Sequence, residues 1–273
     1  MLESRLHAWQ LVVDGEPFHT ATSTLLPVRT RSGEAAMLKH AKAPEERAGL
    51  PLLAWWGGDG AVRVLAYEGD VVLMERVTGD RDLLQWATQD AVADLEASGV
   101  LCEVLLRLHA PRATRPPALA PLAAWFDALE REAARRGGLF SHCAQLARAL
   151  LASTPPGDLV PLHGDCHHRN VLDGGARGWL AIDPKDRFGD RGFDHALILC
   201  NPDLKHAADP ARFAAHLARV AAGASLSPAR LAQWTAARSA LSAVWFLEDG
   251  DAASADHDLA IARTALAWLA DAG

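Results

Sequence analysis

The chain has 273 residues, of which 50% are hydrophobic and 22% charged, and its mean hydropathy is +0.01. These values exclude a disulfide-stapled mini-protein, an intrinsically disordered chain and a membrane-spanning composition. The 27 lysines and arginines against 34 acidic residues give a net charge of −7, which disfavours nucleic acid as a partner and suits a cationic one.

The first predicted domain, residues 1–78, is a small antiparallel sheet. Turn residues separate its short extended runs, which are AWQLVV, STLLPVR, AAMLKHA, AVRVLAY and DVVLMERV. A helix from about residue 44 to 56 interrupts them, with Glu45 and Glu46 near its start, where acidic residues favour the positive end of the helix dipole. The expected order is strand, strand, helix, strand, strand.

The second predicted domain, residues 79–273, is mostly helical. Apolar residues three and four apart, separated by breaks with proline or glycine, predict helices at about 95–109, 119–136, 140–152, 190–199, 210–222, 228–247 and 254–271. Residues 159–183 are the exception, because the runs LVPLHGD and GWLAID and the glycine-rich turn before the second run are typical of a β-hairpin-like insert. The fold class is therefore α+β.

The sequence also bears on the compartment. The four cysteines, Cys102, Cys143, Cys166 and Cys200, are far apart and form no CxxC pair, so we expect free thiols in a reducing compartment. No signal-peptide pattern and no run of about 18 apolar residues is found. We expect a cytoplasmic monomer without membrane contact.

The most informative segment runs from His163 to Asn170 and is followed by Asp183. Phosphoryl transfer from ATP needs a carboxylate to orient the attacking hydroxyl, together with an amide and a second carboxylate to hold magnesium. Asp165, Asn170 and Asp183 supply that set, with Asp165 as the catalytic group and the other two as Mg²⁺ ligands.

Two other readings of this segment remain open. It can be a polar turn of a different enzyme, with His163 a buried core histidine. His163 and His167, four residues apart, can also chelate zinc if they lie on a helix, with Asp165 or Asp183 completing a hydrolase site. Gly164 and the turn residues after Asn170 argue against a helix there.

The first domain offers the groups that ATP needs. Lys39 lies on a predicted strand and can reach the α- and β-phosphates, and Glu46 on the next helix can hold it in place. The carbonyl of Glu75 and the amide of Val77, at the end of the last predicted strand, are candidate partners of adenine. Alternatively, Lys39 extends along a strand edge and the segment at Glu75 is an ordinary strand end.

With these residues assembled, the chain resembles the aminoglycoside phosphotransferases, and within them the streptomycin 6-phosphotransferase branch of aminoglycoside and hydroxyurea resistance kinases. The resemblance implies a protein-kinase-like fold of two lobes, ATP and Mg²⁺ as cofactors, Asp165 as the base, Asn170 and Asp183 as metal ligands, and a structural Asp194. The matching stretches span nearly the whole chain and include LPVR, MLK, LMER, RLHAPR, PLHGDxHHxNVLD, RGWLAIDP, NPDL and LSAxWFxxDGD.

The expected acceptor is a cationic aminoglycoside, for which carboxylates in a cleft are suitable partners. Candidates are the three acidic residues that follow Trp245-Phe246, and Asp186; the three are Glu248, Asp249 and Asp251. A solvated helix end is the alternative for those three.

Departures from the branch lie where the substrate is expected, at Cys166, Arg169 and Lys185. They favour, as alternatives, a kinase of a choline-like or sugar metabolite. A non-catalytic protein that binds nucleotide or antibiotic is a further alternative from a different class.

Overall fold

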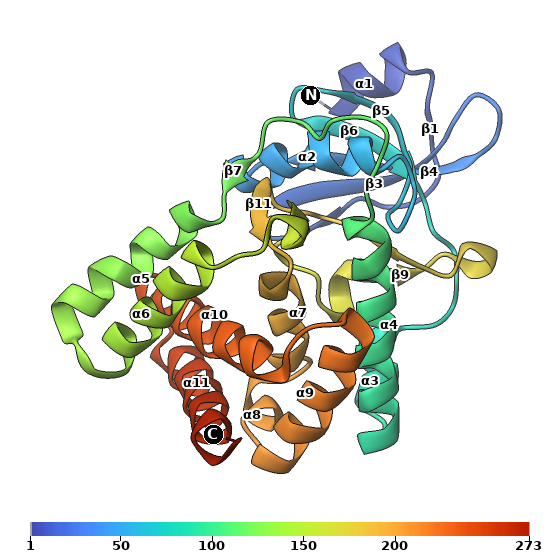
Figure 1. Ribbon diagram of the computed structural model, residues 1–273. Coiled ribbons are helices and arrows are strands. Elements are labelled where there is room, and N and C mark those ends of the chain that lie inside the picture. Colours follow the sequence, from blue (N-terminus) through green and yellow to red (C-terminus); the bar gives the residue numbers. More distant parts are fainter. Residues whose placement is uncertain (1, 273) are drawn as a thin grey trace.

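The computed structural model describes residues 2–272, with residues 204 and 205 described by their backbone alone. An antiparallel sheet of the N-terminal part stands above a larger helical part, as Figure 1 shows. The sheet has the strand order β1-β3-β4-β6-β5, with β2 paired to β3. Its strands are β1 (Val12–Val13), β2 (Phe18–His19), β3 (Ser23–Arg29), β4 (Ala35–Ala41), β5 (Val64–Glu68) and β6 (Val71–Glu75).

The beginning of the chain differs from the expected extended run. Residues Leu2–Ala8 form helix α1, and only Val12–Val13 of AWQLVV pair as a strand. Leu2, Leu6 and Trp9, three and four residues apart, pack their partly buried side chains against the sheet core. The sequence-based prediction missed this helix because the apolar residues that follow it favour an extended run.

Helix α2 (Pro44–Trp56) lies where the sequence predicts a helix. Proline occupies its first position, Glu45 and Glu46 lie in the first turn, and Gly57 ends it with a left-handed backbone (φ +62°). Strands β3 and β4 before α2 and strands β5 and β6 after it follow the expected strand, strand, helix, strand, strand order, and the two-residue strands β1 and β2 precede them.

Residues 76–82 connect β6 to the helical lobe, and the domain boundary at residue 78 stays a prediction. The longer helices of this lobe confirm the expected helical patterns, with ends that differ by a few residues. They are α4 (Ala91–His109), α5 (Ala123–Arg136), α6 (Gly138–Ala152), α7 (Gly192–Leu199), α9 (Pro210–Ala224), α10 (Pro228–Glu248) and α11 (Ala252–Ala272). Two short helices, α3 (Leu83–Ala87) and α8 (Leu204–Ala207), were not predicted.

An aromatic cluster joins these helices at the centre of the lobe. The rings of Phe193 and Trp234 meet edge to face with centroids 6.0 Å apart, and Phe126 contacts both. Such edge-to-face pairs add to the stabilisation from burial. Helix α7, which contains Phe193, is thereby held against α5 and α10, close to the segment from His163 to Asn170.

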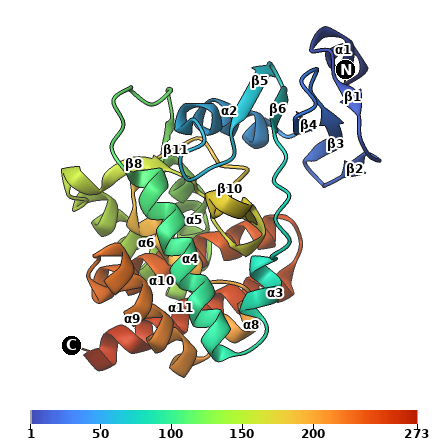
Figure 2. The ribbon, with the colours of Figure 1, turned by 90° about the vertical axis from the view of Figure 1, so that its right-hand side faces the viewer.

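Short strands lie between the sheet and the helices, as Figure 2 shows for β8, β10 and β11. The expectation that the two ends of segment 159–183 form one hairpin is wrong. Strand β8 pairs with β11, whereas the glycine-rich turn joins β9 directly to β10. The five strands are β7 (Ala120–Pro121), β8 (Leu159–Leu162), β9 (Val171–Asp173), β10 (Trp179–Ala181) and β11 (Arg187–Asp190).

All four cysteines are free, as predicted, and the structure shows that all four are buried. Among residues 2–272, no helix has the length and apolar character needed to cross a membrane.

Candidate active site

The loop after β8 is held by a buried carboxylate on α7. Asp194 accepts hydrogen bonds from the main-chain amides of His163 and Gly164, both at 2.8 Å, and lies 2.8 Å from Nε2 of His109. Burial would raise the pKa of Asp194, but His109, with a smaller effect from the amide of Gly164, outweighs it and holds the pKa below its usual value. Asp194 thus has the bracing position that the resemblance implies, and its carboxylate faces the backbone.

His163 is a structural histidine. Its Nε2 lies 2.9 Å from the carbonyl of Ile182, and its Nδ1 accepts from the amide of Asp165 at 3.2 Å. Its ring stacks on Trp56, and burial lowers its pKa, which keeps the imidazole neutral. With both nitrogens engaged, His163 has no lone pair for a metal, so the zinc hypothesis fails in the described residues.

The predicted catalytic Asp165 and the predicted metal ligands lie together. Nδ2 of Asn170 donates to the carbonyl of Asp165 at 2.8 Å and to its Oδ2 at 3.3 Å. The amide of Ile182 donates to the carbonyl of Asn170 at 2.9 Å, which brings the neighbouring Asp183 next to Asn170. Asp183 has a left-handed backbone (φ +58°), an uncommon conformation for a residue with a side chain.

These residues fit a magnesium ion. Oδ1 of Asn170 and Oδ2 of Asp183 have no hydrogen-bond partner within residues 2–272, although their other polar side-chain atoms are engaged. Hard oxygen ligands of this kind, in small number, suit Mg²⁺ that is also held by nucleotide phosphates.

Lys39 joins the sheet to this group of acids. The side chain of Lys39 is almost fully buried, and its Nζ donates to Glu46 at 2.5 Å and to Asp183 at 2.6 Å. The other oxygen of Glu46 accepts from Nζ of Lys185 at 3.0 Å. The sequence-based choice of Glu46 over Glu45 as the partner of Lys39 agrees with this geometry, and Glu46 bridges two lysines.

The electrostatics keep these groups charged. Burial would raise the pKa of Glu46, but Lys39 and Lys185 lower it below its ordinary value. Burial would likewise lower the pKa of Lys185, whereas Glu46 and Asp165 raise it. Each buried charge is therefore stabilised by an opposite neighbour.

Gly49 lets α2 approach this centre closely, a feature the sequence analysis missed. A Cβ atom at residue 49 would lie 1.8 Å from the carbonyl oxygen of Pro184, closer than any non-bonded contact. Pro184 follows Asp183 directly, so the glycine brings the helix that contains Glu46 against the backbone of the second predicted metal ligand. In the sequence, the only indication of this close approach is the glycine itself, near the middle of the predicted helix.

The candidate adenine partners lie at the exit of the sheet. The main-chain amide of Val77 has no hydrogen-bond partner within residues 2–272. Met74, three residues earlier in the chain, is buried. The side chain of Glu75 points to Arg63 and Arg177, which links β6 to the turn between β9 and β10. The free amide of Val77 is thus available for adenine.

A cleft of about 440 Å³ opens beside Asp165. Trp125 and Trp245 meet edge to face in its wall, with ring centroids 5.4 Å apart. Two of the predicted substrate residues, Glu248 and Asp249, line it. The full lining is Glu45, Trp125, Gly164, Asp165, Lys185, Arg238, Ser242, Trp245, Glu248 and Asp249.

The other two predicted substrate residues lie outside that lining. Asp251 caps the start of α11, where it accepts from the amide of Ser254 at 3.0 Å and from its hydroxyl at 2.6 Å. Asp186 pairs with its neighbour Arg187. Glu45, Trp125, Arg238 and Ser242 line the cleft, and the sequence did not indicate them as site residues.

Comparison with known proteins gives the family. Residues 8–250 match the family described as aminoglycoside/hydroxyurea antibiotic resistance kinase. The chain belongs to this family. Two relatives of this kinase are a streptomycin 3''-kinase from Klebsiella pneumoniae and a streptomycin 6-kinase from Streptomyces griseus. The first is 47% identical over 90% of this chain and 92% of the relative, and the second is 34% identical over 93% and 85%.

Solved structures confirm the fold class. This kinase is similar to the crystal structure of a putative fructosamine-3-kinase from Thermobifida fusca, with a TM-score of 0.62 and 19% identity over 96% of this chain and 97% of that one. The fold is protein-kinase-like, with an antiparallel sheet followed by a mostly helical lobe, as the sequence predicts.

Proposed function

We propose that this kinase transfers the γ-phosphoryl group of ATP to a hydroxyl of streptomycin, and thereby inactivates the antibiotic. The observation that supports it best is that one cleft contains both Asp165 and acidic side chains at its outer part, Glu248 and Asp249. Streptomycin has guanidinium groups, and carboxylates are their natural partners.

The acceptor hydroxyl that we favour is the 3'' hydroxyl rather than the 6 hydroxyl. The relative that acts at 3'' shares 47% of its residues with this chain, against 34% for the relative that acts at 6. The family resemblance therefore supports streptomycin as the acceptor, and the higher identity supports the 3'' position rather than the 6 position of the sequence-based prediction.

The roles of the residues follow from their surroundings. Asp165 accepts the hydrogen bond of the acceptor hydroxyl and orients it for in-line attack. Lys39, held by Glu46, binds the α- and β-phosphates, while the main chain at Glu75 and Val77 pairs with adenine. Asn170 and Asp183 would hold Mg²⁺, which neutralises the charge of the phosphates when it is bound.

The test is ADP release by the purified protein with Mg²⁺ and ATP, with and without streptomycin. Wild type is expected to release ADP in response to streptomycin, and Asp165→Ala should lower kcat by at least about a hundredfold while the nucleotide Kd stays within twofold. Asp127→Ala, at an exposed site on α5, is the matched control and should behave as wild type. Near-normal turnover of Asp165→Ala would contradict the role of Asp165.

The same assay separates the alternatives. Choline, simple sugars, hydroxyurea and a kanamycin-type aminoglycoside replace streptomycin in parallel reactions. Turnover with one of these and not with streptomycin would move the proposal to that acceptor, whereas ATP binding without ADP release for any acceptor would favour a non-catalytic binding protein. Two-dimensional NMR of the product identifies the phosphorylated hydroxyl.

A further inference from the structure

Arg238 lies on α10 in the wall of the cleft that contains Asp165. It is only 7% exposed, so its guanidinium has lost most of its contact with bulk water. It also affects the catalytic loop electrostatically, because its charge contributes to lowering the pKa of His167 after the larger effect of burial. Arg238 is therefore a buried cation beside the reaction site.

The guanidinium of Arg238 has no hydrogen-bond or ion-pair partner within the described residues. Its Nε is buried without a hydrogen bond, and within residues 2–272 the side chain takes part in no hydrogen bond and no ion pair. Three other arginines of the helical lobe are paired with carboxylates: Arg191 with Asp158, Arg212 with Asp94 and Arg230 with Asp190.

An unpaired buried guanidinium costs stability, since arginine cannot lose its proton in a protein. The neighbours of Arg238 compensate only in part. Its Cζ lies 5.5 Å from the ring centroid of Phe193, a cation–π contact, and Asp258 is close enough to be affected by its charge but forms no ion pair with it. The two Nη atoms of Arg238 are not fully buried and the side chain lines the cleft, so an occupant of the cleft can accept hydrogen bonds from them.

Along α10 the cleft changes its charge. Arg238, Ser242, Trp245 and Asp249 follow one another at intervals of four, three and four residues, so they share one face of the helix. Ten residues separate Arg238 from Glu248, which corresponds to roughly 15 Å along the helix axis. Glu248, with a side chain 56% exposed, marks the outer end of this wall, and the buried Arg238 marks the inner end.

The inner end is cationic on both sides. Lys185 lines the cleft opposite α10, next to Gly164 of the catalytic loop, and stays charged through its contact with Glu46. An acceptor with several positive groups would be repelled there and attracted at the outer end, where Glu248 and Asp249 lie.

We propose that Arg238 is a substrate-binding residue that donates hydrogen bonds to oxygen atoms of the acceptor beside Asp165, and so fixes which end of the acceptor reacts. The inference rests on the proposed function and deepens it. Streptomycin has two guanidinium groups on one ring, whereas its glucosamine-type ring has hydroxyls and a single methylammonium. The guanidinium ring then faces the outer acids and the hydroxyl-rich ring faces Arg238, as transfer to the 3'' hydroxyl requires.

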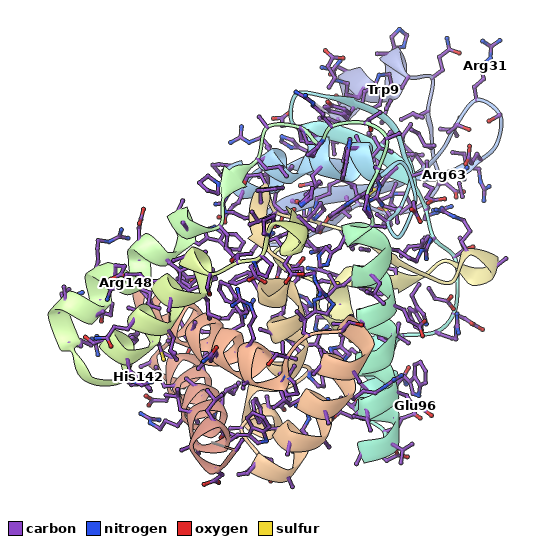
Figure 3. The ribbon with its side chains drawn as sticks, in the orientation of Figure 1. Trp9, Arg31, Arg63, Glu96, His142 and Arg148 are labelled. Atoms are coloured by element: carbon purple, nitrogen blue, oxygen red, sulfur yellow. The ribbon has the colours of Figure 1, made fainter. Side chains whose placement is uncertain are left out.

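The experiment compares Arg238→Gln and Arg238→Lys with wild type and with Arg148→Gln, in which an arginine of the outer helix α6, labelled in Figure 3, is replaced. Steady-state kinetics with streptomycin, the Kd of a non-hydrolysable ATP analogue and the thermal unfolding midpoint are measured for each. We expect Arg238→Gln to raise the KM for streptomycin by about 10- to 100-fold, with a smaller change in kcat and a nucleotide Kd within twofold.

Arg238→Lys keeps the charge and loses the planar fork of donors, so its KM should lie between those of Arg238→Gln and wild type. It also provides the test if Arg238→Gln does not fold. A KM within twofold of wild type in both variants, while wild type is active, would overturn the inference and leave the proposed function intact. A parallel loss of nucleotide binding and thermal stability would overturn it as well, because that pattern indicates a structural role. No streptomycin turnover in wild type would contradict the proposed function itself, and this inference with it.

Discussion

Single residues in this kinase act through the charges around them, and Glu46 is the clearest case. One carboxylate oxygen contacts Lys39 and the other contacts Lys185, so a group on α2 connects a strand of the sheet to the segment after Asp183. Both lysines are well buried, and a buried ammonium without a carboxylate would be costly. Glu46 therefore fixes the positions of two buried cations, the lysine that we propose for the nucleotide and a lysine in the lining of the cleft.

The two neighbouring acids Asp249 and Asp251 should separate by experiment. Asp249 lines the cleft, so Asp249→Asn should raise the KM for streptomycin several-fold and leave the thermal unfolding midpoint unchanged. Asp251 caps α11, so Asp251→Ala should lower the midpoint by a few degrees and leave the KM unchanged. Equal increases in KM for both variants would restore Asp251 as a substrate residue.

The site residues that could be predicted are those in short motifs. Asp165, Asn170 and Asp183 lie in one segment with a known chemical demand, and a strand lysine with an acid on the next helix is a local pattern. Glu45, Trp125 and Arg238 lie far apart in the chain and meet only through the packing of α2, α5 and α10. No spacing in the sequence indicates that these three residues line one cleft, so the wall of the cleft could not be predicted.

At the scale of elements, the longer helices and the central strands could be predicted because their apolar periodicity is long or their ends contain strong stop signals, whereas the short helices α1, α3 and α8 were not predicted. Strands β8 and β11 are short, and their pairing joins segments separated by more than twenty residues. A turn-rich segment between two apolar runs suggests that the two runs pair with each other. Nothing in the runs themselves indicates that each pairs with a different strand, so the sequence could not exclude the wrong pairing.

A substitution at Gly49 tests how closely helix α2 must pack against the backbone of Pro184. Gly49→Ala should stabilise an isolated helix, since alanine has the higher helix propensity. Here the new methyl group meets the carbonyl oxygen of Pro184, and backbone on both sides prevents a local adjustment. We expect α2 to shift and to draw Glu46 away from Lys39 and Lys185, which should raise the KM for ATP and lower kcat, each by about tenfold.

Gly157→Ala is the matched control, because a Cβ atom there would meet nothing within 4 Å. Kinetics with ATP as the varied substrate distinguish the two variants. A wild-type KM for ATP in Gly49→Ala would mean that the position of α2 does not set the position of Glu46.

At the scale of the whole molecule, contacts in the same small region join the two lobes. Lys39 of the sheet pairs with Asp183, and Glu75 pairs with Arg177 in the turn between β9 and β10. The amide of Val62 donates to the carbonyl of Ala181 at 3.1 Å. These links converge on residues 177–185, so the sheet is joined directly to the segment that contains Asp183.

Stability of the whole fold should also depend on pH through Asp258, which is 1% exposed between α10 and α11. Burial raises its pKa from 3.8 to about 6, and Ser242 and Arg238 offset this only in part. Between these two values the native state binds more protons at this residue than the unfolded state does. The contribution of Asp258 is thus fully present below about pH 4 and is lost as the pH rises through 6, and its upper bound is about 3 kcal/mol.

Asp258→Asn keeps the shape of the neutral acid at every pH. Its thermal unfolding midpoint should exceed that of wild type at pH 8, and the difference should shrink towards zero at pH 4. The buried histidines His168 and His195, whose pKa values burial lowers to about 4 and about 3, change stability in the opposite direction, but they are common to both proteins and cancel in the difference.

Asp256→Asn, at an exposed position of the same helix, should show no such trend. A difference that is independent of pH would mean that Asp258 is ionised in the native protein across this range, with Arg238 and Ser242 sufficient to stabilise its charge.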